Sequence, residues 1–201
     1  MYVLYDNLDS GNAYKPRLLM ALLGIPYTRI DLDTDKGETR TPEFLAKNPN
    51  GRIPVLELED GSLLPESNAI LYYLAEGTPF WPADRAARAQ VLQWMFFEQY
   101  SHEPHVAVAR YILRHLPEGH ARHAELPMRL ERGHQALAVM EQHLKSRDFF
   151  VGDRPTIADL ALYAYTHVAE QGRFDLGSYP AIRAWLGRIA ALPGHIPITR
   201  G

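Results

Sequence analysis

The sequence predicts an α/β domain followed by an all-α domain. Over roughly the first eighty residues, short apolar runs alternate with helical patterns, and Asp60-Gly61 is a hairpin signal between two such runs. Beyond this part no segment has the pattern of a strand. A stretch with Pro79 and Pro82 separates the two parts. We therefore expect an α/β domain over residues 1–77, a linker over 78–83 and a helical domain over 84–201.

The first domain is expected to hold a small mixed sheet with helices on its faces. The predicted strands cover residues 2–5, 27–32, 55–58 and 62–64. The predicted helices cover residues 14–23, 42–47 and the stretch from 67 onward, with Gly24 as a C-cap and Thr41 and Ser67 as N-caps. The first two strands are joined through a helix and must be parallel neighbours, whereas the hairpin strands are antiparallel.

Helical periodicity predicts four helices in the second domain. The first is capped by Asp84, runs to about residue 115 and is interrupted by Pro104. The second covers about residues 125–144, the third begins at Thr156, and the fourth ends before Pro193-Gly194.

Two features of this half are expected to be structural. Thr156 and Asp159 have the spacing of a capping box, which stabilises a helix start by about 1 kcal/mol. Trp94, Phe96 and Phe97 cannot all face one core, so at least one of them is expected to be exposed.

Composition excludes several classes of function. The net charge of −3 gives no reason to expect nucleic acid or a membrane surface as a partner, and no apolar run reaches the roughly 18–20 residues that span a bilayer. The first residues do not resemble a signal peptide. The absence of cysteine excludes disulfides, thiolate metal sites and an enzyme thiol as nucleophile. A cytoplasmic location fits this composition.

Four motifs in a fixed order carry a resemblance to a known family. They are Leu4-Tyr5 with Ser10-Gly11-Asn12, the run Asn48-Pro49-Asn50-Gly51-Arg52-Ile53-Pro54-Val55, Glu66-Ser67-Asn68-Ala69-Ile70, and residues 152–159. With these motifs the whole chain resembles the glutathione S-transferase superfamily, in particular its bacterial theta- and nu-like members. The resemblance implies a thioredoxin-like glutathione-binding domain, an all-helical domain that forms the electrophile pocket, and a homodimer.

One end of the implied site is Glu66-Ser67. A helix start with a serine suits a γ-glutamyl carboxylate, because backbone N–H groups and the positive end of the helix dipole favour an anion. Glu66 is placed to face the ammonium group. The alternative is that Ser67 is only an N-cap and Glu66 only an acid in the first turn.

The middle of the implied site is Ile53-Pro54. The resemblance implies a cis proline, with the backbone of Ile53 pairing with the cysteinyl unit of glutathione as a strand would. Arg52, and less directly Arg40, are candidates for glutathione's carboxylates. An ordinary trans proline and solvated arginines are the alternatives.

Ser10 and Asn12 are the candidate thiol activators. A free thiol has a pKa near 8.5, and a hydrogen-bond donor beside a helix N-terminus can lower it. By resemblance, Ser10 matches the serine of theta-like classes and Asn12 an asparagine of other bacterial classes. A turn with a helix cap is the alternative. Tyr5 is expected to point into the core.

His102-Glu103-Pro104-His105 is not the His-Glu-x-x-His zinc pattern, and we predict no metal site there. The resemblance places this stretch near the active-site cleft. Tyr100, His102 and His105 are therefore candidates for the electrophile pocket, and partly buried structural side chains are the alternative.

Three functions remain open at this point. The first is a glutathione transferase of the detoxification type, in which the thiolate attacks a small hydrophobic electrophile. The second is glutathione-dependent reduction of disulfides or peroxides. The third is a non-catalytic binding or regulatory protein that retains the fold.

Overall fold

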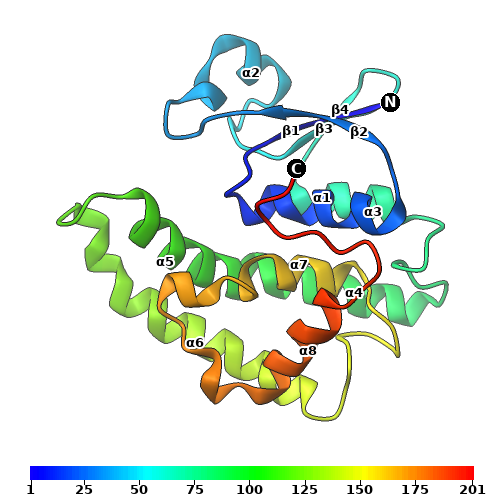
Figure 1. The fold of residues 1–201 in the computed structure, drawn as a ribbon, viewed down its shortest axis with the longest axis vertical. Coiled ribbons are helices and arrows are strands. Elements are labelled where there is room, and N and C mark those ends of the chain that lie inside the picture. Colours follow the sequence, from blue (N-terminus) through cyan, green and yellow to red (C-terminus); the bar gives the residue numbers. More distant parts are fainter. The chain divides into compact units, whose positions relative to one another are not determined.

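The chain forms an α/β unit and an all-helical unit in the computed structural model, which describes residues 1–201 (Figure 1). Unit 1 comprises Met1–Thr78 and Leu192–Gly201, and unit 2 comprises Pro79–Ala191. The predicted order of an α/β part and a helical part is therefore confirmed. The structure differs from the expected boundaries, because the expected linker is divided between Thr78 in unit 1 and residues 79–83 in unit 2, and because residues 192–201 belong to unit 1.

Unit 1 is built on a four-stranded mixed sheet with strand order β2-β1-β3-β4. The strands are β1 (Tyr2–Asp6), β2 (Tyr27–Asp31), β3 (Val55–Glu57) and β4 (Leu63–Pro65). β1 is parallel to β2, and β3 is antiparallel to both β1 and β4. The parallel pair and the hairpin predicted from the sequence are thus both present.

Helices α1 (Gly11–Leu23) and α3 (Ser67–Ala75) cover one face of this sheet, and α2 (Pro42–Lys47) lies on the other side (Figure 1). A short 3-10 helix, Glu38–Arg40, precedes α2. Gly24 ends α1 in the left-handed conformation, with φ of 66°. Ser67 is the first residue of α3 rather than its N-cap, which corrects the prediction; Glu66 holds the cap position with φ of 73° and makes no side-chain cap bond.

The core of unit 1 lies between the sheet and its helices. Its completely buried apolar side chains include Leu4, Leu18, Leu56, Ile70 and Leu71. On the other face, Tyr5 packs with Phe44 of α2 and Val55 of β3. The expectation that Tyr5 is a core residue is therefore confirmed, and its hydroxyl donates to Glu57 Oε2 at 2.8 Å.

Unit 2 contains only helices. Its main helices are α4 (Arg85–Phe97), α5 (Glu103–His115), α6 (Leu126–Leu144), α7 (Ile157–Thr166) and α8 (Pro180–Ala190). Short 3-10 helices cover Ala121–Glu125, Ala169–Gly172 and Leu176–Ser178. A π-helical turn, Glu98–His102, divides the long helix predicted over residues 84–115. Pro104 lies in the first turn of α5, directly after this π-helical turn.

The capping box predicted at Thr156 and Asp159 is present at the start of α7. Asp159 is completely buried and accepts hydrogen bonds from the N–H groups of Phe150 (3.0 Å) and Thr156 (2.8 Å) and from Trp185 Nε1 (3.0 Å). Burial raises the pKa of this carboxyl to about 6, although the donated hydrogen bonds oppose the rise. Asp159 therefore holds together a loop and two helices.

Among the three aromatic residues of α4, Phe96 is 69% exposed while Trp94 is 8% exposed. This confirms that at least one of them faces outward. No helix in the structure combines the length and apolar character that a membrane crossing requires.

Replacing Asp159 with alanine is expected to lower the free energy of unfolding by about 3 kcal/mol or more, because four buried donors, including the Thr156 hydroxyl, lose their acceptor at about 1–3 kcal/mol each. Urea denaturation followed by circular dichroism measures this. Asp153→Ala is the control, since that side chain is 92% exposed and its loss is expected to cost less than about 0.5 kcal/mol. Equal stability of the two variants would contradict the assigned role.

Candidate functional site

Three loops meet at one edge of the sheet in unit 1. β1 ends at Asp6, and Val55 at the start of β3 lies opposite Tyr5. Pro65 at the end of β4 also lies opposite Val55. The loop after β1, the turn before β3 and the start of α3 therefore converge. These loops carry Ser10 and Asn12, Ile53-Pro54, and Glu66-Ser67, so the fold brings together the three sequence motifs of the first domain.

Ser10 is the N-cap of α1. Its backbone is extended, with φ of −78° and ψ of 118°, and its Oγ accepts a hydrogen bond from the N–H of Ala13 at 3.2 Å. A hydroxyl has one donor and two acceptor sites, so the cap bond uses only an acceptor. The hydroxyl proton remains available to a ligand. The helix cap and the chemical role are thus compatible in one side chain.

Asn12 lies in the first turn of α1 and contacts the start of α3. Its Oδ1 accepts a hydrogen bond from Ser67 Oγ at 3.4 Å. Ser67 is 5% exposed and lies at the N-terminus of a nine-residue helix. Unpaired N–H groups and the dipole at such an end favour an anionic ligand.

Lys15 belongs to the same cluster and was missed by the sequence-based search. Its side chain is completely buried, and Nζ lies 3.3 Å from Ser67 Oγ and 3.4 Å from Asn68 Oδ1. A buried ammonium adds positive charge where α3 begins, which further favours an anion there. The sequence does contain a signal for this residue. Lys15 has helical spacing with Leu18, Leu19 and Leu22, so it lies on the apolar face of α1.

The turn before β3 presents a backbone segment. The Ile53-Pro54 peptide bond is cis, as the resemblance implies. Asn48 shapes this turn, because its Oδ1 accepts from the N–H of Asn50 (3.1 Å) and its Nδ2 donates to the carbonyl of Arg52 (2.8 Å). The N–H and C=O of Ile53 make no backbone hydrogen bond, so both are open to a peptide-like ligand.

The charged candidate residues around this turn differ in whether their side chains already bond to the protein. Arg40 Nη1 donates to the carbonyl of Asn50 at 3.0 Å, so this side chain braces the turn. A Cβ on Gly51, which has φ of 62°, would overlap the Arg40 guanidinium. The side chains of Arg52 and Glu66 are exposed. Arg52 thus has the freedom to meet a ligand, whereas Arg40 has a structural task as well.

The candidates in unit 2 do not form one group. Tyr100, which is 86% exposed, and the buried His105 line a groove of about 810 Å³ between the π-helical turn, α5 and α6. Burial, with the positive charges of Arg129 and Arg132, lowers the pKa of His105. His102 does not line this groove; it is completely buried, with Nε2 3.0 Å from Thr166 Oγ1.

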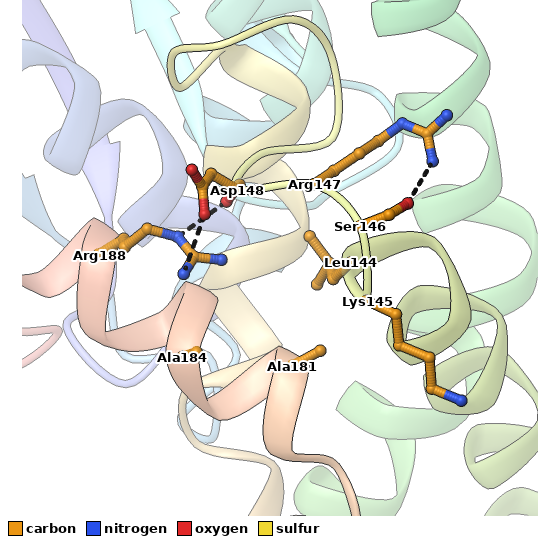
Figure 2. A pocket seen from close by; sticks show the side chains of 8 residues that line it. All are labelled: Leu144, Lys145, Ser146, Arg147, Asp148, Ala181, Ala184 and Arg188. Carbon is orange, nitrogen blue, oxygen red and sulfur yellow. Dashed lines mark hydrogen bonds and ion pairs between the residues drawn. The ribbon is translucent and has the colours of Figure 1, made fainter.

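A second hollow in unit 2, of about 340 Å³, lies between the end of α6, the loop that follows and α8 (Figure 2). Its wall includes the ion pair between Arg188 Nη1 and Asp148 Oδ1 at 3.4 Å. None of the candidate residues lines it. In the whole chain no group of three or more His, Asp or Glu side chains is arranged to hold a metal ion.

Two family models match most of the chain. The family model described as glutathione S-transferase, N-terminal domain, matches residues 1–76, and the one described as glutathione S-transferase, C-terminal domain, matches residues 98–193. The chain therefore belongs to the glutathione S-transferase family.

Individual relatives are of several kinds. A crystal structure of a glutathione S-transferase from Pseudomonas fluorescens is 53% identical, with a TM-score of 0.95 over 99% of both chains. Maleylacetoacetate isomerase of Pseudomonas aeruginosa is 34% identical over 98% of this chain and 93% of the relative. The structure of Ure2p in complex with glutathione is 28% identical, with a TM-score of 0.88 over 100% of this chain and 93% of the other.

Proposed function

We propose that the protein is a glutathione transferase that activates the glutathione thiol with Ser10. One observation carries this proposal: the Ser10 hydroxyl is oriented by the N–H of Ala13 and keeps its proton for a ligand. It does so at the same sheet edge as Ser67 and Ile53. The glutathione complex of the related Ure2p supports glutathione as the ligand.

The binding part of the proposal follows the charges of the site. The γ-glutamyl carboxylate takes the start of α3, where the backbone N–H of Ser67 donates and the buried Lys15 supplies positive charge. Glu66 faces the ammonium group. The open backbone of Ile53, next to Pro54, pairs with the cysteinyl unit. Arg52, with Arg40 behind it, serves glutathione's glycine carboxylate.

The chemical step is nucleophilic. A donor on sulfur that lowers a thiol pKa from about 8.5 by two units supplies about 2.7 kcal/mol to the thiolate. The proton leaves to solvent, and the thiolate forms a C–S bond with the electrophile without a covalent enzyme intermediate; with a chlorinated aromatic the C–Cl bond breaks and chloride leaves. The electrophile pocket belongs to the helical part, with His105 as its candidate. Tyr100, which is 86% exposed, is assigned to a contact between subunits, and His102 supports the structure through Thr166. The proposed setting is cytoplasmic, where glutathione is abundant.

Asn12 favours a second candidate, glutathione-dependent reduction of disulfides or peroxides. Its Oδ1 accepts from Ser67, which fixes the orientation of the side-chain amide, and its amide nitrogen is a donor group that suits a glutathione sulfur. A regulatory protein without catalysis is the third candidate, since Ure2 of Saccharomyces cerevisiae carries the name transcriptional regulator.

The proposal also includes a homodimer. Tyr100 (86% exposed) and Val139 (49% exposed) line the groove of unit 2, and Phe96 (69% exposed) lies on α4. Large apolar side chains that remain exposed support an interaction site in this part of the unit. We assign it to a second copy of the chain.

Glutathione binding and turnover distinguish the three functions. Calorimetry is expected to give a dissociation constant in the micromolar to millimolar range, and the protein is expected to conjugate a chlorinated aromatic electrophile faster than it reduces a mixed disulfide. Faster disulfide reduction would favour the second candidate. Binding without turnover of either substrate would favour the third, and absence of binding would contradict the first two.

Ser10→Ala is expected to raise the pKa of the bound glutathione thiol by about one to two units, because the thiolate loses its donor. Ultraviolet thiolate absorbance as a function of pH measures this. The variant also loses an N-cap worth about 1 kcal/mol, so its folding is checked separately. Asn12→Ala is the matched comparison. A larger rise with Asn12→Ala would transfer the activating role to that residue.

Tyr100→Glu is expected to convert the dimer to a monomer at micromolar concentration, because a carboxylate would be buried in the apolar contact. Sedimentation velocity measures this. Tyr111→Glu on α5 is the control, since Tyr111 is 40% exposed but does not line the groove. A monomeric wild-type protein would contradict the assignment.

A further inference from the structure

Arg17 on α1 is completely buried, although it lies outside the cluster around Ser67. Its Nη1 donates to two carbonyls of the last segment of the chain, those of Ile198 (2.8 Å) and Arg200 (2.6 Å). Its Nη2 donates to the carbonyl of Leu8 at 3.1 Å, and its Nε lies 2.9 Å from Asp6 Oδ2. One guanidinium thus joins the end of β1, the loop after it and residues 192–201.

Burying a guanidinium group adds little net stability to a fold. An ion pair removed from water pays a large desolvation cost, and an apolar side chain of similar volume often stabilises as well or better. Arginine's planar fork, in contrast, fixes the direction of several acceptors at once. The role that fits Arg17 is therefore one of geometry.

The geometry concerns the loop that carries Ser10. Asn7 holds one part of this loop, because its carbonyl accepts from the N–H of Ser10 (3.0 Å) and its Oδ1 accepts from the N–H of Asp9 (3.0 Å). The remaining residue, Leu8, is held through its carbonyl by Arg17. Without that bond the loop lacks its second anchor two residues before Ser10.

Arg17 in turn depends on residues 192–201, which run beside α1 (Figure 1). Tyr14, one turn earlier on the same face of α1, donates to the carbonyl of Ile196 at 2.6 Å. Together Tyr14 and Arg17 hold three carbonyls of this segment. Residues 192–201 therefore hold the Arg17 guanidinium in place, and the guanidinium holds the loop between β1 and α1.

We propose that Arg17 is a positioning residue for Ser10, and that it acts by fastening the β1–α1 loop to residues 192–201. This inference rests on the proposed function, in which the Ser10 hydroxyl meets the glutathione thiol. Arg17 touches neither the thiol nor the electrophile; it sets the direction of the hydroxyl through Leu8.

The test uses the full chain with Arg17→Lys, which keeps a charge beside Asp6 but lacks the fork that reaches the carbonyls. In glutathione-free protein, amide hydrogen exchange in residues 7–13 is expected to accelerate about tenfold, while exchange in β3 and β4 stays unchanged. With glutathione bound, the thiolate fraction at neutral pH is expected to fall about tenfold, with affinity changed less than about threefold.

Arg29→Gln is the matched control. Arg29 Nη1 lies 3.6 Å from the same Asp6 carboxylate, but Arg29 bonds none of the three carbonyls held by Arg17. This variant is expected to leave both readouts at the wild-type values. If it reproduces the effects of Arg17→Lys, the charge on Asp6 is responsible and the proposal is overturned. Unchanged loop exchange in a folded Arg17→Lys protein overturns it as well.

Tyr14→Phe is a second test of the fastening, and it leaves Arg17 unchanged. Loss of the bond to Ile196 is expected to accelerate exchange in residues 192–201 and also in residues 7–13. Faster exchange in the first segment alone would overturn the proposal, even if Arg17→Lys fails to fold. Failure of the wild-type protein to bind glutathione is a separate result, which contradicts the proposed function, whereas the exchange measurements on unliganded protein test the fastening itself.

Discussion

β3 pairs antiparallel with β1, with Leu56 opposite Leu4 and Val55 opposite Tyr5. Both leucines are completely buried, and a register shift by one residue would turn them to the opposite face of the sheet. The apolar core therefore sets the register. The register then sets the separation between the loop that carries Ser10 and the turn that carries Ile53. The geometry of the polar loops therefore depends on side chains that are buried in the core.

α1 carries two buried cations with different tasks. Lys15 and Arg17 are two residues apart, so they lie on different sides of the helix. Lys15 reaches the start of α3, and Arg17 reaches the loop after β1 and residues 192–201. Each buried charge requires polar partners, because an unpaired one would be costly. The helix thus holds the start of α3 and the loop after β1 at a fixed separation.

The sequence predicted the order of elements because that order depends on local signals. The period of the apolar residues, the Asp60-Gly61 turn and the caps at Thr41 and Asp84 are each readable within a few residues. The motifs also placed Ser10, Ile53 and Ser67 at one site, which the strand pairing then brought together. Glu66 shows the limit of local signals, because a glutamate gives no indication that its φ will be 73°. The sequence therefore places the start of α3 one position too late.

The docking of residues 192–201 on unit 1 was not predictable for a related reason. Arg17 and Tyr14 bind main-chain carbonyls there, and every residue type has one. No side-chain pattern in the segment marks it as a partner. Lys15 differs, because a lysine at a core position of α1 was a visible exception to the apolar pattern.

Unit 1 is discontinuous in the chain, and this has a consequence for its synthesis. When Met1–Thr78 emerges from the ribosome, the three carbonyls that Tyr14 and Arg17 bind have not yet been made. All of unit 2 is translated first, which takes on the order of ten seconds at ordinary elongation rates. During that interval the Arg17 guanidinium on α1 can reach Asp6 and the carbonyl of Leu8, but not the carbonyls of Ile198 and Arg200. The nascent α/β unit is thus complete only when the last residues join it, after the helical unit has been made.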